Sequence, residues 1–391
     1  MTGNREALRV VGTSVTLPEP LRRRAVEDLG FPIRFTILDG ESCLRQGVLH
    51  PESYDVYDQW FYSAELLWTA GAIQAIDTTR IDRWRDVVLP DGGQGARPGD
   101  VLYVQHDQRL GPAPSSAISM LPTTYNADSF AWGPEVRDLL RPDEEASWAW
   151  LFDERWHGRC TVNHDPAVGV VELALGARAA GLMKVQDVGN LSIDEIDRLF
   201  DLLERRRKSG HFNRCWSTHE ESIRQMSGAN CVLGALWAPA YYALRAAGHD
   251  LSYAVPREGY RSWQSGLCLS SALHPAQRDM AYSYLNWWLS GVPGALLARQ
   301  GYYMSVIDPV AEILSPAEHG YWYEGLPASE MLHGLDGRVV VRKGERREGG
   351  SHRDRIARIV LWSTLMPEHN YLARRWRAFW SGAAAPGGAG R

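Results

Sequence analysis

The sequence predicts an α/β protein with two domains, and three observations lead to this prediction. Its 391 residues are more than one ordinary hydrophobic core holds. Short runs with the alternation of a strand are interleaved along the chain with amphipathic runs that have the period of a helix. Apolar residues make up 45% of the chain and charged residues 23%, which is typical of a soluble globular protein.

The first elements are expected to be a strand, a helix and a second strand. Residues 8–16 open as a short strand that ends near Gly12, and residues 18–29 place their apolar side chains on one helical face. Residues 33–39 alternate as the next strand. This order opens a doubly wound α/β domain, in which ligands bind at the carboxyl ends of the strands.

Helical patterns recur further along the chain. Helices are expected at residues 167–180, 192–209 and 275–289. The second is the best defined, because Ser192 and Glu195 form a capping box and apolar residues repeat on one face. The basic run Arg205–Lys208 suits the negative end of the helix dipole, so we interpret it as a solvated helix end and not as a nucleic-acid patch.

Several segments have little core-forming character. Residues 89–116, rich in Gly, Pro and Asp, are expected to form a surface insertion. Residues 336–352 are charged and Gly-rich and predict an exposed loop, whereas residues 353–380 predict a helical tail. From about residue 382 the chain is expected to be disordered.

The stretch from Gly228 to Ser271 contains two strand-like runs that carry one Trp each. Residues 231–236 run into Trp237, and the second run has Trp263 at its head. A large aromatic ring at a strand end lies where the sheet meets solvent. Such a ring suits the lining of a cleft better than the filling of a core.

Four motifs follow one another in a specific order. They are residues 228–237, 255–263, 284–289 and 299–303. Together they resemble the extracellular solute-binding proteins of ABC importers, specifically the spermidine/putrescine-binding branch, and the likeness extends from about Tyr54 to the C-terminal helices. The resemblance implies a two-lobed periplasmic-binding-protein-like α/β fold of type II, with the ligand cleft between the lobes.

The resemblance also implies how the chain is divided. Lobe I is expected to contain residues 1–123 and a return segment, residues 265–312. Lobe II is expected to contain residues 124–264. Residues 313–391 are expected to form C-terminal helices that pack across the lobes.

Residues that match ligand-facing positions of the family occur in both expected lobes. Where the family has an aromatic residue after the first strand, this chain has Thr13 and Ser14, which make that wall smaller and more polar. The ligand-binding candidates are Thr13, Ser14, Trp60, Tyr125, Asp165, Trp237, Trp263, Ser265 and Tyr302.

Some of these candidates have a plain structural alternative. Trp60 is equally interpreted as a Trp that covers a strand end. Tyr125, with its neighbours Asn126 and Asp128, is equally interpreted as part of a turn before a helix. Tyr302 is equally interpreted as a core residue.

The acidic residues that the family would use are fewer here. Polyamine binders of this branch offer an acid at the position of Asp165 and another three residues later, where Val168 stands. Ser265 likewise stands where the family has an acid. Each buried ammonium needs a partner, so the charge count favours a ligand with a single positive charge, although Asp58 or Asp128 would add a second charge if either faces the cleft.

The expected ligand is therefore a small amine-bearing or quaternary-ammonium solute. It would lie between Trp237 and Trp263 and be held by cation-π contacts, with Asp165 as the counter-charge. The implied function is that of an ABC transporter substrate-binding protein, which captures this solute by lobe closure. It would then deliver the solute to the permease subunits in the membrane.

No catalytic motif is present, so no enzyme activity, cofactor or metal is expected. A nucleophile elbow, a P-loop and a dinucleotide fingerprint are all missing, and the twelve His show no metal-ligand spacing. The alternative function is an enzyme or a cytoplasmic ligand sensor on the same scaffold. The enzyme form of it would have a Cys, Asp or Glu poised in the cleft as nucleophile or base.

Charge, cysteines and the first residues bear on partners and location. A net charge of -5 argues against nucleic-acid binding, and five Cys without a CxxC spacing suggest buried thiols, not disulfides. By resemblance the protein is expected to be periplasmic and monomeric. No apolar export signal is visible at the start of the chain, so cytoplasmic retention stays open.

Overall fold

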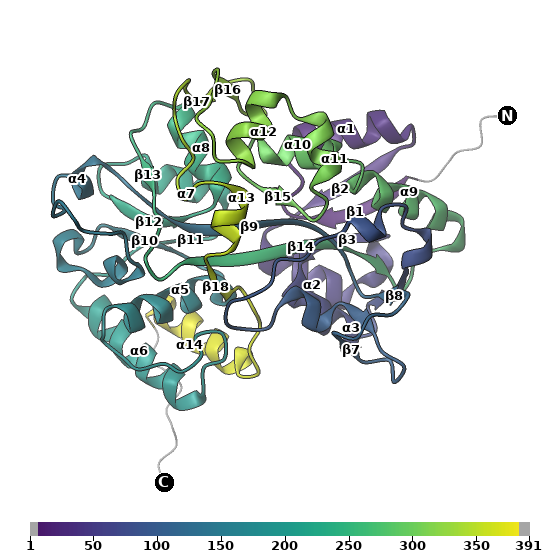
Figure 1. The fold of residues 1–391 in the computed structure, drawn as a ribbon. Coiled ribbons are helices and arrows are strands. Elements are labelled where there is room, and N and C mark those ends of the chain that lie inside the picture. The colour runs from purple at the N-terminus through teal and green to yellow at the C-terminus, as the bar shows by residue number, and fades with distance from the viewer. Residues whose placement is uncertain (1–6, 383–391) are drawn as a thin grey trace, which may run out of the picture. The chain divides into compact units, whose positions relative to one another are not determined.

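The computed structural model describes residues 7–382 and divides the chain into two compact units (Figure 1). Unit 1 contains the chain up to Asp91, Arg97–Ala127 and Ser262–Ala357. Unit 2 contains Gly92–Ala96, Asp128–Arg261 and the chain from Arg358 onward. The chain passes from one unit to the other inside strands β9 (Leu121–Trp132) and β14 (Tyr260–Ser270).

These passages differ from the expected boundaries at 123/124 and 264/265. The structure has them at Ala127/Asp128 and Arg261/Ser262, and further passages lie at Asp91/Gly92, Ala96/Arg97 and Ala357/Arg358. Residues 313–391, which the sequence analysis treated as one group, are therefore shared between unit 1 and unit 2. Both β9 and β14 are continuous strands, so neither passage coincides with the turn residues that a sequence pattern would mark.

Unit 1 is built on a sheet whose first strands are parallel. They pair in the order β2-β1-β3, and β14 lies antiparallel to β3. The strands are β1 (Leu8–Gly12), β2 (Ile33–Ile37), β3 (Val56–Trp60) and β4 (Ile73–Gln74), which pairs with β14. Helix α1 (Glu19–Leu29) lies between β1 and β2 in sequence, so the predicted strand-helix-strand opening is confirmed.

Helices flank this sheet. In Figure 1, α1 and α9 lie together on one side and α2 and α3 on the other. The helices are α2 (Gly40–Leu49), α3 (Ala64–Thr69), α9 (Arg278–Trp288), α10 (Val292–Ala298), α11 (Asp308–Ile313) and α12 (Pro316–Trp322). The helix predicted at residues 275–289 is confirmed as α9, whose apolar face is buried.

Residues 89–116 lie mostly at the surface, as expected. They are not without regular structure, however, because they contribute two strands to a small antiparallel sheet with the order β5-β8-β6-β7. The strands are β5 (Ile76–Asp77), β6 (Tyr103–Val104), β7 (Leu110–Gly111) and β8 (Ala117–Ile118). Leu102 and Val104 are buried there, and such short strands carry too few residues for a periodic pattern to be recognised.

The strands of unit 2 pair in the order β11-β10-β12-β9, with β13 also paired to β9. The strands besides β9 are β10 (Cys160–Asn163), β11 (Cys215–Trp216), β12 (Leu233–Leu236) and β13 (Ser252–Tyr253). The helices are α4 (Pro134–Arg137), α5 (Pro166–Ala179), α6 (Ile193–Lys208), α7 (His219–Met226) and α8 (Ala238–Ala246).

Two helices of unit 2, α5 and α6, match the helices that the sequence predicts. Helix α6 begins at the expected capping box of Ser192 and Glu195 and buries Ile196, Leu199 and Leu203. Helix α5 is buried on nearly all sides. A Cβ at Gly169 would lie 2.0 Å from the carbonyl oxygen of Asn163, so the glycine permits this close packing.

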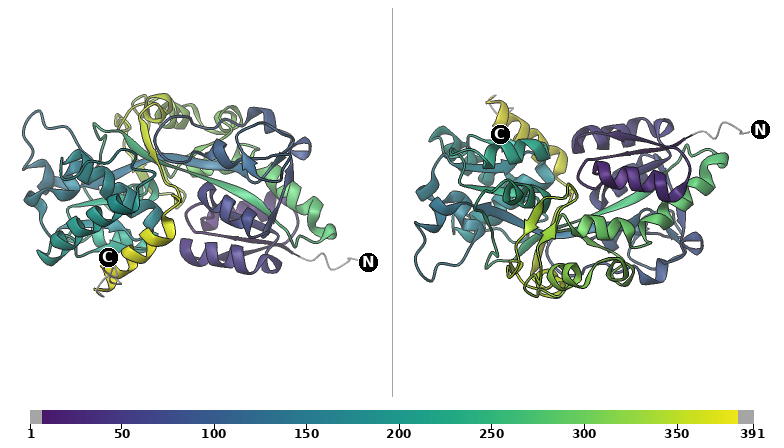
Figure 2. Two further views of the ribbon diagram at one scale, coloured as in Figure 1. Left: turned by 90° about the horizontal axis from the view of Figure 1, so that it is seen from below. Right: turned by 90° about the horizontal axis from the view of Figure 1, so that it is seen from above.

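The C-terminal part corrects two further expectations. Residues 336–352 are not only an exposed loop, because β16 (Leu332–His333) pairs with β17 (Val339–Val341) and Arg347 is buried. Residues 353–380 are not one helical tail but contain α13 (His352–Ile356), β18 (Ile359–Trp362) and α14 (His369–Ser381). Helix α14 packs beside α5 and α6 (Figure 2). The expected disorder concerns residues that lie, after Gly382, outside the described chain.

Candidate functional site

A buried carboxyl group lies at the carboxyl end of the parallel strands of unit 1. Asp58 of β3 is 0% exposed, and its side-chain oxygens accept hydrogen bonds from the hydroxyl groups of Thr16 (3.1 Å) and Ser265 (3.0 Å). Within residues 7–382, no Lys, Arg or His pairs with it. Burial raises the pKa of the Asp58 carboxyl to about 7, and the two hydroxyl bonds oppose this only in part.

The end of β1 lies directly beside this carboxyl group. A Cβ at Gly12 would lie 2.9 Å from the carbonyl oxygen of Asp58, so the two strand ends approach closely. Thr13 and Ser14 follow Gly12; Thr13 is buried, whereas Ser14 is exposed. The end of β1 that the sequence assigned to ligand contact thus lies beside Asp58 of β3.

Trp60 lies on the same face of β3 as Asp58, because residues two apart in a strand point to the same side. Its ring stacks on that of Tyr62, with centroids 5.8 Å apart and 15° between the planes. The far edge of the ring lies against Gly40, where a Cβ would come within 2.7 Å. Ser265 is the register partner of Trp60 across the β3–β14 pair. Asp58, Trp60 and Ser265 therefore form one polar and aromatic group.

Trp263 and Tyr302 form a second aromatic pair in unit 1. Their rings meet edge to face, with centroids 5.0 Å apart. The sequence pattern predicts Trp263 at the head of a strand, but β14 begins at Tyr260 and Trp263 is 3% exposed inside it. Tyr302 is 0% exposed. Both rings are buried in this structure.

Tyr125 of β9 belongs to a cluster of polar aromatic side chains with Tyr303 and His352. It is the register partner of Tyr303 in β15 (Tyr303–Met304), so its interpretation as part of a turn before a helix is wrong. Its hydroxyl group lies 2.7 Å from Nε2 of His352. Burial, with smaller contributions from nearby arginines, lowers the pKa of His352 to about 4, so this imidazole is neutral near pH 7.

The candidates of unit 2 lie at the ends of its strands. Trp237 directly follows β12, as the sequence predicted, and is the N-cap residue of α8. Its ring meets that of Trp216 edge to face at 4.9 Å. Asp165 caps α5, and one of its carboxylate oxygens accepts a hydrogen bond from the backbone N–H of Ala167 (2.9 Å). Capping a helix is thus one role of Asp165.

Asp128, considered from the sequence as a second charge, is engaged in a buried network of unit 2. The Arg261 guanidinium lies 3.6 Å from Asp128 Oδ2 and donates to Glu172 Oε1 at 2.9 Å. The Tyr253 hydroxyl donates to the other Asp128 oxygen at 3.3 Å. Burial raises the pKa of Glu172 to about 7, opposed by Arg261. One guanidinium therefore serves two carboxyl groups, and Asp128 has a cationic partner where Asp58 has none.

No thiol in the described chain is activated as a nucleophile. Burial raises the pKa of Cys43, Cys160, Cys215, Cys231 and Cys268 above the ordinary value. All five are free, as the sequence predicted. A catalytic Cys would need the opposite shift, toward the thiolate.

Two further features lie away from the predicted residues. Unit 2 has surface pockets of about 670 Å³ near Arg155 and about 560 Å³ near Arg198, and neither contains any of the nine candidates. We give the buried strand ends more weight, because both pockets are lined mainly by charged surface side chains. Separately, Glu154, His157 and His211 lie close enough together to hold a metal ion.

Comparison with known proteins gives a consistent picture of the fold. No protein-family model matches the sequence, and a search of curated proteins finds no match. Among solved structures, the chain is similar to a putative spermidine/putrescine ABC transporter from Listeria monocytogenes, at 12% identity and TM-score 0.66, over 95% of this chain and 98% of that one. It is also similar to the spermidine/putrescine ABC transporter substrate-binding protein from Streptococcus pneumoniae, at 12% identity and TM-score 0.62, over 96% and 99%.

A third similar structure is the periplasmic-binding protein MotA from A. tumefaciens B6, solved in complex with glucopine. It has 9% identity and a TM-score of 0.63, over 96% of this chain and 100% of that one. None of the helices in the described chain combines the length and apolar character that a membrane crossing requires. The chain has the two-lobed α/β fold of ABC-transporter substrate-binding proteins.

Proposed function

We propose that this chain is the substrate-binding protein of an ABC importer. It captures a small amine-bearing or polyamine-like solute by closure of its lobes and delivers it to permease subunits in the membrane. Support comes from a likeness that covers 95–96% of the chain and includes proteins described as spermidine/putrescine transporters. The proposal places the protein outside the cytoplasmic membrane as a monomer.

The proposal that the ligand is an amine rests on Asp58, a buried acid. Asp55, on the same segment, pairs with Arg9, and Asp128 pairs with Arg261. Asp58 is equally buried, but within residues 7–382 its side-chain partners are two neutral hydroxyl groups. A buried carboxylate without a cation is costly, and an ammonium group of a ligand would supply the missing charge.

The ligand that fits this arrangement carries a single positive charge near Asp58. Thr13 and Ser265 would bond its polar parts, and Trp60 would offer a ring face to the ammonium group. Asp165, which the sequence predicts as the counter-charge, remains a second candidate for that role. Ser14, Tyr125, Trp237, Trp263 and Tyr302 remain predicted ligand contacts. A linear polyamine needs two or more partners of this kind, so a monocation or zwitterion is favoured over spermidine.

Calorimetric titration with choline, putrescine and spermidine tests the proposal. We expect a monocation to bind more tightly than spermidine, and Asp58→Asn to weaken its binding at least about thirtyfold, the lower range for losing a buried charge partner. Asp55→Asn is the matched control, since Asp55 is buried and acidic but already paired with Arg9. Asp165→Asn tests the second candidate.

Tight spermidine binding that survives both Asp58→Asn and Asp165→Asn would refute the ligand assignment. A product assay on the same mixtures addresses the enzyme alternative, because turnover of a bound solute would favour it. Fractionation of the native host addresses location. A purely cytosolic pool would rule out the importer role.

A further inference from the structure

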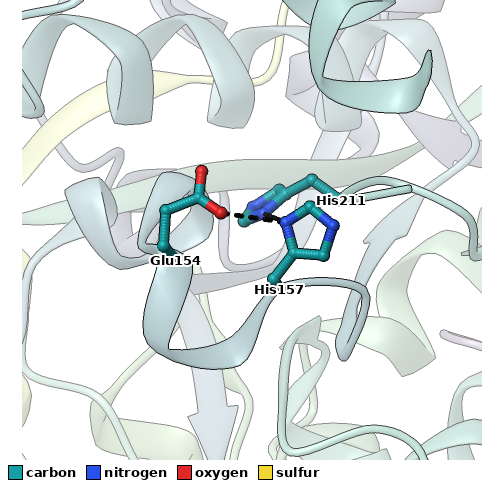
Figure 3. Close-up of side chains that lie close together, drawn as sticks. All are labelled: Glu154, His157 and His211. Atoms are coloured by element: carbon teal, nitrogen blue, oxygen red, sulfur yellow. Dashed lines mark hydrogen bonds and ion pairs between the residues drawn. The ribbon is translucent and has the colours of Figure 1, made fainter. Parts of the chain in front are cut away.

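Three side chains of unit 2 converge on one point at the protein surface (Figure 3). Glu154 lies in the short 3-10 helix Glu154–Trp156, and His157 follows directly after it. His211 follows the turn that ends α6. Glu154 Oε2 is 2.9 Å from His157 Nδ1, and His157 Nδ1 is 3.4 Å from His211 Nδ1.

The hydrogen bonds of the two rings fix where their protons lie. His157 Nε2 is 2.8 Å from the backbone carbonyl oxygen of Ser209, and His211 Nε2 is 2.8 Å from that of Leu151. A carbonyl oxygen only accepts, so each Nε2 must carry the hydrogen and donate it. In the neutral form of each ring, Nδ1 then carries a lone pair.

These lone pairs face one another. Two imidazole nitrogens and one carboxylate oxygen point at a common centre, and no hydrogen of a neutral ring lies between them. A single extra proton on His157 Nδ1 would form a hydrogen bond to one of the other two atoms, Glu154 Oε2 or His211 Nδ1. It would leave the third atom without a donor. A bound cation would satisfy all three at once.

The spacing suits a transition metal. Two ligands at the usual Zn–N distance of about 2.0–2.1 Å and a tetrahedral angle are separated by roughly 3.4 Å, the separation of the two Nδ1 atoms. Backbone carbonyls that accept from the distal ring nitrogens are also how metal-bound histidines are commonly oriented. Imidazole and carboxylate donors favour zinc and its neighbours over calcium or magnesium.

We propose that Glu154, His157 and His211 form a site for a divalent transition metal such as Zn²⁺, with one coordination position open to solvent. His211 is 0% exposed and provides a rigid ligand. The side chains of His157 and Glu154 are 36% and 64% exposed and provide the entry path. A bound metal would tie the segment after Leu151 to the end of α6.

One neighbour opposes the metal. The Arg206 guanidinium pairs with the other oxygen of Glu154. Its positive charge repels a cation and competes for the carboxylate. Removing this guanidinium should therefore strengthen metal binding. Weak binding of the metal elsewhere on the surface would not be strengthened by this change.

The test is titration of the chelator-stripped full chain with Zn²⁺ by calorimetry, and with Co²⁺ by absorption spectroscopy. We expect one equivalent to bind, with Co²⁺ bands typical of a four-coordinate site. His157→Ala and Glu154→Gln should each weaken binding by at least about tenfold, since even a lost outer partner costs that much. Arg206→Gln should tighten it.

His50→Ala is the matched control, because His50 Nδ1 also lies beside a glutamate, Glu52, at 3.3 Å and is exposed. No third ligand joins this pair in the part of the chain that the structure describes. His50→Ala should leave Zn²⁺ affinity and the Co²⁺ spectrum unchanged. Melting curves of all variants without metal exclude a folding defect as the cause. The proposal is overturned if Zn²⁺ does not bind, or if His157→Ala and His50→Ala have the same effect.

Discussion

Replacing Asp58 by Asn should make the ligand-free protein more stable near neutral pH while it removes the charge that we assign to ligand binding. Asn has nearly the shape of Asp and carries no charge. Its carbonyl oxygen can still accept from one hydroxyl group, and its amide can donate to the other if that hydroxyl rotates. Thr16 and Ser265, which bond Asp58 at 3.1 and 3.0 Å, are suited to this exchange.

The magnitude follows from the pKa of Asp58. It is raised from 3.8 to about 7, and one pKa unit corresponds to about 1.4 kcal/mol. Because the folded-state pKa is the higher one, the stability contributed by the protonated carboxyl is fully present below about pH 3.8 and is lost as the pH rises through about 7. The loss for the wild type is therefore roughly 4 kcal/mol near pH 8 and under about 2 kcal/mol near pH 5, and the Asn variant escapes it.

Urea unfolding at both pH values measures this difference. The variant should be more stable than the wild type near pH 8, and the gap should shrink toward pH 5. Asp55→Asn should have the opposite sign, because it removes the buried carboxylate partner of the half-buried Arg9 guanidinium. Equal stability of Asp58→Asn and the wild type near pH 8, or a gap that does not depend on pH, would show that Asp58 does not carry an uncompensated charge.

Three other predictions concern the rest of the fold. Arg261→Met should destabilise the protein by about 3–5 kcal/mol at neutral pH, measured by urea unfolding, because Asp128 and Glu172 lose their cation; a neutral effect would mean that both are already protonated. Ser192→Ala should cost about 1 kcal/mol in the same assay by removing the cap of α6, with no change in the slope of the transition. The pKa of His352 is lowered to about 4 from 6.5, so its contribution to stability is lost as the pH falls from 6.5 through 4; His352→Gln should reduce the difference in melting temperature between about pH 7 and pH 5, and an unchanged difference would contradict this reasoning.

Local patterns predicted the elements whose signals are contained in a few consecutive residues. The capping box of α6, the apolar face of α9 and the strand-helix-strand opening each depend on neighbours in the chain, and each is confirmed. The end of β12 before Trp237 was predicted for the same reason, since Pro239 of α8 follows within three residues of that end.

The failures come from contacts between residues distant in sequence. Arg347 stands in a charged, Gly-rich run that reads as a solvated loop. Its guanidinium instead donates to the Tyr303 hydroxyl at 2.7 Å and to the Trp322 carbonyl oxygen at 2.9 Å, so it is 4% exposed. No pattern within residues 336–352 predicts that Arg347 contacts Tyr303 and Trp322. The same holds for β18, whose residues have a helical pattern in the sequence. Its partner is β14, which is distant in sequence, so no local signal indicates the strand.

The metal-ligand group was missed for a similar reason. Metal motifs are recognised by short spacing, and Glu154 with His157 alone is a common surface pair. The third ligand, His211, comes from beyond α6. A signal did exist: Gly210 and His211 directly follow the predicted helix end, which is a position where the chain turns back.

The buried acids show what a sequence leaves open at the candidate site. Asp55, Asp58 and Asp128 are all fully buried, and all lie in or next to strands. What distinguishes the three carboxyl groups is the partner of each. Asp55 pairs with Arg9 and Asp128 with Arg261, whereas Asp58 is bonded by two hydroxyl groups. Both arginines come from strands distant in sequence, so no local pattern separates the three residues. A site that binds a cation must retain an acid that the protein itself does not neutralise, and by that criterion Asp58 is the residue on which ligand recognition should depend.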